Sequence, residues 1–428
     1  MKALIMSHAH PDFSIGGAQV ASHNLHLGLR QQPGWSSHYL AGVGDPVMPH
    51  RDTPLMALDR AEDESLFWSK EFDWFHLGST DVGALMAHFE RFLVELQPDI
   101  VNMHHVMGFG VQAIRSIRRA LGDVPIVYTL HEYLPICAHH GQMIKPRTHA
   151  LCHRATPSDC GMCFPEIGAA NLLRRETFIK RFFDQVDAFV SPSHFLLSRY
   201  ADWGLPEDKL VMIENGLEAG TPAEVRTLGP RGRRNRFGYF GQLNPFKGIR
   251  VLVDAVTRIP ADVWGDSILN VYGGNLEQQP EDFQRAVKEL FRIAGRRVRY
   301  RGAYKSHELP ALMRDIDWMV IPSTWWENSP VVIQEAFFHG RPVIASDIGG
   351  MAEKVRHGVD GLHFGVSNPD SLAETMTQAI TSPRLWDQLH AGIRPPRTAH
   401  DAGALHAELF EKLLARRADR RSPVRAAG

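Results

Sequence analysis

The sequence predicts an α/β protein with two domains, each built around a parallel sheet. Short apolar segments that suit buried strands alternate with helical segments over most of the chain, and this alternation is typical of parallel sheets. A length of 428 residues is enough for about two such domains. Polar and Gly-rich residues follow several of the strands, where open parallel sheets bind ligands. We therefore expect one cleft, shared by the two domains, at the carboxyl ends of the strands.

The expected elements fall into two sets. The strands predicted for the first set are residues 2–6, 100–103, 126–130, 188–190 and 211–213. The strands predicted for the second set are residues 236–240, 268–272, 298–301, 318–321 and 342–345. Helices are expected over residues 18–29, 371–380 and 402–414.

These elements place the first domain at residues 1–217 and the second at residues 236–385. The segment between them, residues 218–235, is rich in Gly, Pro and Arg, which is typical of a linker. Residues 386–428 are expected to form terminal helices and a basic tail.

The composition is that of an ordinary soluble globular protein, with 44% hydrophobic and 22% charged residues. The formal net charge of −1 gives no overall positive field, so nucleic acid is not an expected partner. The chain contains no run of about 18 apolar residues, hence no transmembrane helix is expected. Residues 1–7 suit a short strand rather than a signal peptide. We therefore expect a cytoplasmic protein.

The most informative feature is a predicted helix start between two acids, Glu327 and Glu335. Ser329 suits the N-cap of this helix, and Pro330 suits its first position. The amides of the next two residues, Val331 and Val332, then lack intrahelical partners. With the positive end of the helix dipole, they form a site for an anion.

The two acids flank this anion site. Glu327 lies in the loop before the helix, and Glu335 lies roughly 7 Å along its axis. One acid is thus placed on each side of a bound diphosphate, one toward a sugar and one toward a ribose. Taken alone, the two acids would equally suit a helix end without a ligand, because acids are common there.

The segment resembles the Glu-x7-Glu signature of retaining GT-B glycosyltransferases, in particular glycosyltransferase family four. The resemblance implies the GT-B fold, with two Rossmann-like domains facing a central cleft and a last helix that crosses back to the first domain. It also implies that Glu335 holds the ribose hydroxyls of a nucleotide and that Glu327 holds hydroxyls of the donor sugar.

Residues 241–248, Gly-Gln-Leu-Asn-Pro-Phe-Lys-Gly, resemble the family's Gly-Arg-Leu-x3-Lys-Gly stretch. Lys247 matches the family's lysine, which neutralises the leaving diphosphate. Gln242 stands where the family usually has Arg, so one expected positive charge is absent. Because a Pro-Phe-Lys-Gly turn presents Lys247 at a strand end, we favour a functional lysine over a solvated surface one.

Further candidates follow other strands. Gly16 and Gly17 allow close approach of a ligand to a helix start, and family members carry such a pair facing the donor diphosphate. Gly273 is a similar point of backbone approach, although an ordinary turn would also explain it. His131 lies in Tyr-Thr-Leu-His-Glu-Tyr, which resembles the family segment whose His contacts the donor sugar. In isolation, a structural His would be the commoner outcome.

Weaker candidates complete this set. His104 and His105 are expected to line the acceptor side. Asn215-Gly216 and Gly349-Gly350 resemble family elements too, and a hinge or turn role is the simpler interpretation of both pairs.

All the cysteines fall within one insert, residues 137–163. They are Cys137, Cys152, Cys160 and Cys163, and the last two have the Cys-x2-Cys spacing of zinc ligands. We expect a structural zinc site that shapes the acceptor entrance, with four unrelated reduced thiols as the alternative.

Together the resemblances imply a hexosyltransferase that uses a nucleotide diphosphate sugar and a glycan or lipid-linked acceptor, in cell-surface polysaccharide or glycolipid synthesis. The base is left open among uracil (UDP), guanine (GDP) and adenine. No metal is expected to be required for the chemistry. The expected catalytic residues are His131, Lys247 and Glu327. The expected donor-binding residues are Gly16, Gly17, Gln242, Lys247, Gly273, Ser329, Val331, Val332 and Glu335.

Alternatives from other classes stay open. A sugar phosphorylase or a nucleotide-sugar epimerase can share this architecture, and a phosphorylase would need a lysine that holds pyridoxal phosphate. A sugar-nucleotide sensor without catalysis gains some support from Gln242. The basic stretch at residues 171–183 suits an amphipathic helix packed on the first sheet, with peripheral contact to a membrane as the second interpretation.

Overall fold

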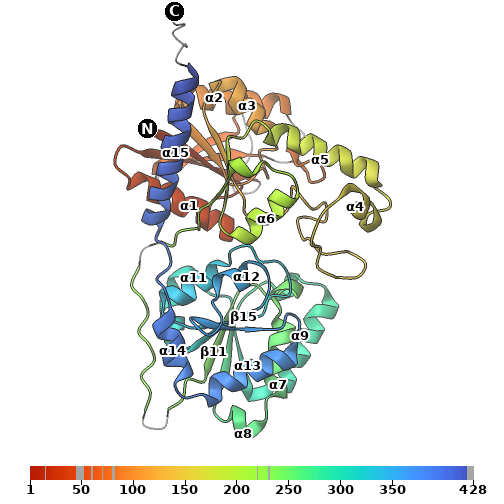
Figure 1. Ribbon diagram of the computed structural model, residues 1–428, viewed down its shortest axis with the longest axis vertical. Helices are drawn as coiled ribbons and strands as arrows, with labels where there is room; N and C mark the ends of the chain where they lie inside the picture. The colour runs from red at the N-terminus through yellow and green to blue at the C-terminus, as the bar shows by residue number, and fades with distance from the viewer. Residues whose placement is uncertain are drawn as a thin grey trace, which may run out of the picture. The chain divides into compact units, whose positions relative to one another are not determined.

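The computed structural model describes residues 1–14, 16–44, 53–58, 61–69, 71–79, 82–218, 220–229 and 232–421. The chain divides into two compact units, one formed by Met1–Glu218 with Arg397–Gly428 and the other by Ala219–Pro396 (Figure 1). The predicted α/β class with Rossmann-like, parallel-sheet domains is confirmed. The linker predicted at residues 218–235 lies in part outside the described residues.

The first unit is built on an eight-stranded sheet with the order β10-β9-β8-β7-β1-β2-β4-β3. Its strands are β1 (Lys2–Ser7), β2 (Ser36–Val43), β3 (Leu55–Leu58), β4 (Ala61–Trp68), β7 (Ile100–Met103), β8 (Ile126–Thr129), β9 (Ala188–Ser191) and β10 (Leu210–Met212). All neighbours are parallel except β3, which is antiparallel to β4. The order changes direction between β1 and β7, so a ligand crevice is expected at the carboxyl ends of these two strands.

Helices cover this sheet, and the last of them returns from the second unit. They are α1 (Gly17–Arg30), α2 (Val82–Leu96), α3 (Gln112–Leu121), α4 (Pro157–Cys163), α5 (Ala169–Phe183), α6 (His194–Asp202) and α15 (Ala399–Arg421). Helices α1 and α15 pack so closely that a Cβ built on Gly28 of α1 would overlap the carbonyl oxygen of Ala399 at the start of α15. The chain leaves the first unit after Glu218 and re-enters it at Arg397, and these two segments are hydrogen-bonded to each other, with Leu217 N donating to Arg397 O at 2.9 Å.

The second unit is a six-stranded parallel sheet with the order β13-β12-β11-β14-β15-β16. Its strands are β11 (Arg236–Phe240), β12 (Ile268–Tyr272), β13 (Val298–Gly302), β14 (Trp318–Ile321), β15 (Val343–Ser346) and β16 (Gly361–Phe364). Its helices are α7 (Ile249–Arg258), α8 (Ala261–Trp264), α9 (Glu281–Ala294), α10 (Leu309–Arg314), α11 (Val331–Phe338), α12 (Gly349–Lys354), α13 (Pro369–Thr381) and α14 (Leu385–Gly392). This is the strand order of the Rossmann fold, and it reverses between β11 and β14.

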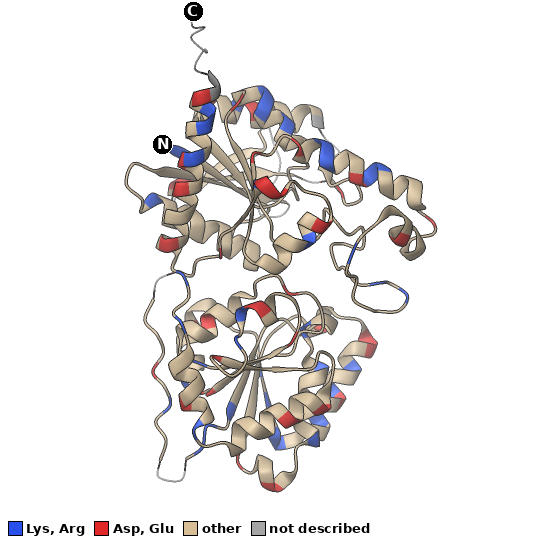
Figure 2. Cartoon of the chain, in the orientation of Figure 1, with Lys and Arg blue, Asp and Glu red and all other residues tan. Residues whose placement is uncertain are grey.

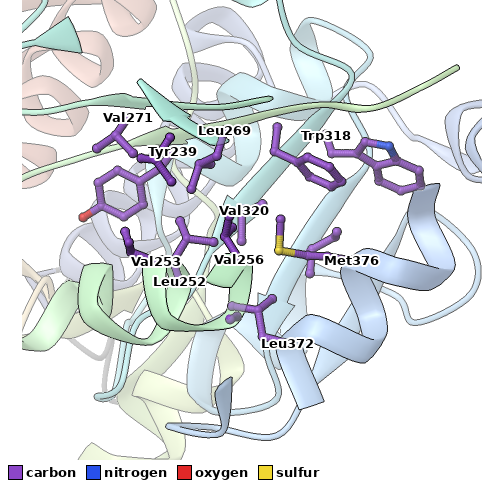
Figure 3. Packing of buried hydrophobic residues seen from close by; sticks show 14 of the residues in the cluster. Tyr239, Leu252, Val253, Val256, Leu269, Val271, Trp318, Val320, Leu372 and Met376 are labelled. Atoms are coloured by element: carbon purple, nitrogen blue, oxygen red, sulfur yellow. The ribbon is translucent and has the colours of Figure 1, made fainter. Parts of the chain in front are cut away.

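Both faces of the second sheet are buried, each by its own core. Tyr239 and Val320 belong to the core that α7 and α13 complete, and Figure 3 shows Val320 close to Met376 of α13. The next residue along β11, Phe240, belongs to the opposite core, together with Met319 of β14. Successive strand residues point to opposite faces, so central strands covered on both sides are apolar throughout.

The structure adds strands that the sequence did not indicate, namely β2, β3, β4 and β16, together with the short antiparallel pair β5 (Phe72–Asp73) and β6 (Gly78–Ser79). Strands β2 and β4 mix polar and apolar residues, so they lack the continuous apolar run that marks a buried strand. Strand β3 is a run of only four apolar residues, and part of it is exposed at the sheet edge. Helix α14 contributes Trp386 and Leu389 to the core of the second unit, and only α15 belongs to the first.

Candidate functional site

The crevice of the second unit lies between β11 and β14, and the loops that follow these two strands are in close contact with each other. The loop after β11 turns on Asn244, whose Oδ1 accepts hydrogen bonds from the amides of Phe246 and Lys247, both at 3.0 Å. Gly248 then takes a positive φ of 71°. A Cβ on Gly248 would overlap the carbonyl oxygen of Pro322, in the loop after β14. Only glycine therefore allows this turn to present Lys247 beside the second loop.

Lys247 and Glu327 form an ion pair that joins the two loops, with Nζ 2.6 Å from Oε1. The Ser323 hydroxyl also donates to Glu327, at 2.7 Å. Burial acts to raise the pKa of Glu327, but the Lys247 charge and the hydrogen bonds outweigh it, so the pKa is lowered. Glu327 is therefore an ionised carboxylate. The sequence placed both side chains at this crevice but did not indicate that they would bind each other.

The backbone around Glu327 is fixed by the start of α12. The amide of Gly350 donates to the carbonyl oxygen of Glu327 at 2.7 Å. A Cβ on Gly350 would overlap the carbonyl oxygen of Asn328. The close approach at Gly349-Gly350 is thus made by the protein's own backbone, in line with the structural interpretation of this pair.

Helix α11 begins one residue later than predicted. Pro330 has a ψ of 116°, which is not helical, so Pro330 occupies the N-cap position and Val331 is the first helical residue. The prediction that Ser329 caps the helix is therefore wrong. Its Oγ is instead buried, with no hydrogen-bond partner among the described residues. The Ser329 hydroxyl and the amides of Val331 and Val332, which lack intrahelical carbonyls, are three donors available to an anion.

Glu335 is the fifth residue of α11 and is partly buried. Burial raises the pKa of its carboxyl group to about 7. Burial and, to a smaller extent, the Glu335 charge also raise the pKa of Tyr304, so the two side chains are neighbours. A carboxylate held in this environment gains from any ligand hydroxyl that donates to it, because such bonds favour the charged form.

The other predicted donor-binding residues of this unit lie nearby. The amide of Gly273 donates to Gly302 O at 2.8 Å, and a Cβ on Gly273 would overlap the carbonyl oxygen of Gly241. Close packing of two strand ends therefore accounts for this glycine. The Gln242 side chain is exposed beside them. Donor contacts by Gln242 and Gly273 stay predictions.

In the first unit, a hydrogen-bond relay leads to His131. The hydroxyl of Thr129 donates to Asn102 Oδ1 at 2.9 Å, so the amide nitrogen of Asn102 faces His104 Nε2, at 3.4 Å. His104 therefore carries its hydrogen on Nδ1 and donates it to His131 Nε2, at 2.8 Å. His131 in turn keeps its hydrogen on Nδ1, which makes that nitrogen a donor with a fixed direction.

The relay belongs to a group of histidines that are buried or half-buried. Burial lowers the pKa of His131 to about 3 and those of His8 and His406 to about 4, and it holds those of His104 and His105 well below the usual value. All of them are neutral at pH 7. His8 directly follows β1, so its strand-end position would have identified it. His406 comes from α15, and only the tertiary structure reveals it.

Two family profiles match the chain, "Glycosyltransferase Family 4" over residues 15–220 and "Glycosyl transferases group 1" over residues 234–382. The chain belongs to the GT4-type GT-B glycosyltransferases.

Curated relatives agree with this family. An uncharacterised glycosyltransferase of Methanocaldococcus jannaschii is 28% identical over 39% of this chain and 44% of its own length. D-inositol 3-phosphate glycosyltransferases of Corynebacterium efficiens and Nocardioides sp. are 28% and 25% identical, over 41% and 69% of this chain. The matches span 41% and 62% of those two proteins, so this glycosyltransferase covers less than two thirds of each of the three relatives.

Solved structures share the fold over nearly the whole chain. Anabaena HepE in complex with UDP has a TM-score of 0.60 at 20% identity, over 98% of this chain and 99% of that one. Sucrose-phosphate synthase of Thermosynechococcus elongatus has a TM-score of 0.70 at 16% identity, over 97% and 100%. At this identity the likeness establishes the GT-B fold.

The predicted donor-side glycines of the glycosyltransferase lie at the start of α1. Gly16 is the N-cap and Gly17 the first helical residue, and no side chain caps this end. A Cβ on Gly16 would crowd the Gln19 side chain, at 2.5 Å from its Oε1. The helix start is thus built from backbone alone, as the prediction requires, and its contact with a donor stays a prediction.

The cysteine insert of the glycosyltransferase brings its four thiols into one region. Burial, followed by the neighbouring Cys137, Cys152 and Cys163, raises the pKa of Cys160 to about 12. Among the described residues, however, no three of these sulfur atoms all lie within 4.8 Å of one another. A tetrahedral zinc site would require the insert to tighten around the ion, and zinc stays a prediction.

The basic stretch at residues 171–183 lies in α5, which packs by its apolar residues. Leu172, Ile179 and Phe183 are buried. The guanidinium of Arg175 is buried too and donates to the carbonyl oxygens of Phe75, Leu134 and Pro135. In the part of the chain that the structure describes, no helix is long and apolar enough to cross a membrane.

Proposed function

We propose that this glycosyltransferase moves a sugar from a nucleotide diphosphate sugar to a glycan or lipid-linked acceptor, with retention of the anomeric configuration. The observation that carries the proposal is the Lys247–Glu327 ion pair beside the open start of α11. A cation and three donors that have no partner among the described residues lie along one edge of the sheet, at the crevice where Rossmann-type sheets bind nucleotides.

The diphosphate is the ligand that suits this edge. Its oxygens can accept hydrogen bonds from the Ser329 hydroxyl and from the amides of Val331 and Val332, and the helix dipole favours their charge. Lys247 is already oriented by Glu327, so it can meet the growing charge of the leaving group without reorganisation. This fixed electrostatic environment supports a role for Lys247 in catalysis.

The two acids would hold the two sugars of the donor. Glu335 would accept hydrogen bonds from ribose hydroxyls, which would stabilise a carboxylate whose pKa burial raises to about 7. Glu327 keeps one oxygen for Lys247 and Ser323, so the remaining oxygen can accept from a hydroxyl of the transferred sugar. His131 would donate from Nδ1 to another hydroxyl of that sugar.

The reaction breaks the bond between the anomeric carbon and the β-phosphate oxygen and forms a bond from that carbon to an acceptor oxygen. The electron pair of the broken bond stays on the diphosphate, and the acceptor proton passes to a phosphate oxygen. We assign attack to the face from which the diphosphate departs, which retains the configuration and needs no protein nucleophile.

Similar proteins support the donor class. HepE has been solved with UDP and with UDP-glucose, and the starch synthase IV catalytic domain with ADP and acarbose. We favour a uridine nucleotide as donor. A role in cell-surface polysaccharide or glycolipid synthesis is supported by the likeness to the lipopolysaccharide galactosyltransferase WaaB and to a Klebsiella pneumoniae protein of a cps region.

Calorimetric titration with UDP, GDP, ADP and their glucose derivatives tests the donor, followed by hydrolysis and transfer assays with the donor that binds. We expect one diphosphate to bind and Glu327→Gln to abolish turnover while the fold is kept. Binding of none of these nucleotides would overturn the proposal. Binding with no hydrolysis or transfer would instead favour a sensor, and NMR of the product linkage decides between retention and inversion.

A lipid-linked acceptor would bring the first unit to a membrane surface. The outer side of α5 exposes Leu173 with Arg174 and Arg181, and Figure 2 shows basic residues along this helix. Arginines with an exposed leucine suit an anionic lipid surface. We expect the protein to sediment with vesicles that contain phosphatidylglycerol and Arg174→Glu with Arg181→Glu to release it. Equal sedimentation of this variant would contradict the contact.

A further inference from the structure

A second cluster of polar side chains lies in the first unit, apart from the histidine group at the ends of β7 and β8. It joins His10, from the loop after β1, to His23 of α1 and Glu64 of β4. His10 Nε2 and His23 Nε2 each lie 2.9 Å from an oxygen of the Glu64 carboxylate. In the described parts of the chain, this is the group of three potential ligands whose donor atoms all lie within 4.8 Å of one another.

A further imidazole, that of His26, points at the same carboxylate. His26 lies three residues after His23 on α1, so both side chains share one face of the helix. Its side chain is fully buried, and its Nε2 has no hydrogen-bond partner among the described residues. This nitrogen lies 3.8 Å from Glu64 Oε1 and 3.7 Å from Asp63 Oδ2. A buried ring nitrogen left without a partner is unfavourable, which indicates a missing ligand.

We propose that His10, His23, His26 and Glu64 form a binding site for a divalent transition-metal ion of the zinc class. Neutral imidazole nitrogens and a carboxylate are the ligands that zinc takes in proteins. In a tetrahedral site with bonds of about 2.1 Å, neighbouring ligand atoms lie about 3.4 Å apart. The nitrogens of His10 and His23 lie 2.9 Å from the Glu64 oxygens and need shifts of about half an ångström to reach that value. His26 lies outside the group whose donor atoms all fall within 4.8 Å of one another, so its ring has to move further toward the ion. Calcium and magnesium would instead require mainly oxygen ligands.

Groups behind the ligands suit the same ion. The Nδ1 of His10 lies 3.5 Å from the carboxylate of Asp12, and the Nδ1 of His26 lies 2.9 Å from the Ser37 hydroxyl. A metal-bound imidazole needs an acceptor for its other N–H, and these oxygens can take it. Asp63 is held beside the cluster by Arg30, at 3.0 Å. The Asp12 amide now donates to His10 Nδ1. When Nε2 of His10 binds a metal, Nδ1 carries the hydrogen, so it would donate to the Asp12 carboxylate instead of accepting from the Asp12 amide.

The ion would tie three elements of the first unit together. His10 belongs to the segment that leads from β1 to Gly16, the helix start proposed to face the donor diphosphate. Binding would fix this segment against α1 and β4, and thus stabilise the unit whether or not a donor is present. A hydrogen-bond network without metal is the competing explanation, and it leaves His26 Nε2 without a partner.

The test uses the full-length protein, stripped with a chelator and then titrated with Zn²⁺ and Co²⁺. Bound metal is counted by mass spectrometry after dialysis, for the unmodified protein, His23→Asn, Glu64→Gln and the control His38→Asn. His38 neighbours Tyr39 on β2 but pairs with Ser65 rather than with Glu64. We expect one equivalent of metal to be lost in His23→Asn and Glu64→Gln and kept in His38→Asn.

The cysteine insert does not confuse this result, because cobalt held by thiolates absorbs strongly in the near ultraviolet and would do so equally in all variants. Zinc should also raise the melting temperature of the unmodified protein and of His38→Asn by several degrees more than that of the two ligand variants. Equal metal content in all four proteins would overturn the proposal in favour of a hydrogen-bond network. Zinc-edge anomalous diffraction from the unmodified protein decides independently of any variant, since a peak must lie between His10 and His23.

Discussion

Replacing Glu335 with glutamine separates the stability of the second unit from its proposed function. Burial raises the pKa of Glu335 from 4.5 to about 7. Each pKa unit corresponds to roughly 1.4 kcal/mol, so ionising this carboxyl group in the folded protein costs about 3 kcal/mol relative to the unfolded chain. Glutamine has nearly the same shape and never ionises. Glu335→Gln should therefore stabilise the protein wherever the native carboxyl group would be charged.

The sign of the effect sets a characteristic pH profile. Between pH 4.5 and about 7 the unfolded chain loses the Glu335 proton while the folded protein keeps it. The free energy of unfolding of the unmodified protein thus falls with rising pH across this window, relative to the variant. The advantage of Glu335→Gln should be near zero at pH 4.5, grow through pH 6, and reach a plateau of about 3 kcal/mol above pH 7.

Urea denaturation at half-unit steps from pH 4.5 to 8.5, followed by circular dichroism, measures this difference. Glu374→Gln on α13 is the matched control, because Glu374 is exposed in the same unit. A difference between Glu335→Gln and the unmodified protein that does not change with pH would refute the reasoning. A profile equal to that of Glu374→Gln would do so as well.

The same substitution, Glu335→Gln, should weaken the binding of the nucleotide. Hydrogen bonds to a charged group contribute about 1.5–3 kcal/mol, so Glu335→Gln should bind the nucleotide diphosphate about 10- to 100-fold more weakly at pH 8. In the unmodified protein, affinity should rise between pH 6 and pH 8 as the carboxyl group ionises. Calorimetric titration at both pH values measures this. Unchanged affinity at pH 8 would leave the stability argument standing and reject the ribose assignment.

Further predictions concern four other positions. Lys247→Met leaves the buried Glu327 carboxylate unpaired, so we expect a loss of about 3–5 kcal/mol in urea denaturation at pH 7, largely relieved by adding Glu327→Gln, with turnover absent in both. Gly350→Ala should destabilise the second unit by about 1–3 kcal/mol and reduce turnover, because its Cβ overlaps the backbone after Glu327; an unaffected Tm would contradict the packing. Thr129→Val removes the first donor of the relay, and we expect KM for the donor to rise while the nucleotide alone binds as before. Cys160→Ser should reduce the zinc content by one equivalent in elemental analysis, and unchanged content would exclude the cysteines as ligands.

Particular residues show how far sequence reasoning reached. Lys247 and Glu327 were each placed correctly at the end of a strand, because glycine turns and apolar strands are local patterns. Their ion pair was not anticipated, since it depends on β11 and β14 being neighbours at the point where the strand order reverses. The error at Ser329 has a local cause, because the extended ψ of Pro330 shifts the helix start by one residue.

Strands that carry polar residues were harder to predict than apolar ones. β11 and β14 are covered on both faces and therefore appear as apolar runs. β2 and β4 combine polar with apolar residues, and their polar members include His38 and Glu64. These polar residues obscured the strands in the sequence. Because β4 was not predicted, the sequence also offered no reason to connect His10 and His23 with Glu64, which both of them contact in the structure.

The amino-acid sequence by itself determined the α/β class, the two mainly parallel sheets and the family, because strand composition, turn chemistry and short motifs depend on residues close together in the chain. Tertiary structure alone decided which distant side chains meet: Lys247 with Glu327, His406 with the histidines after β7 and β8, and three imidazoles around Glu64. The physical reason is that charge pairing, burial and the pKa shifts that follow depend on distances through space, which are fixed only when the sheets and helices have packed.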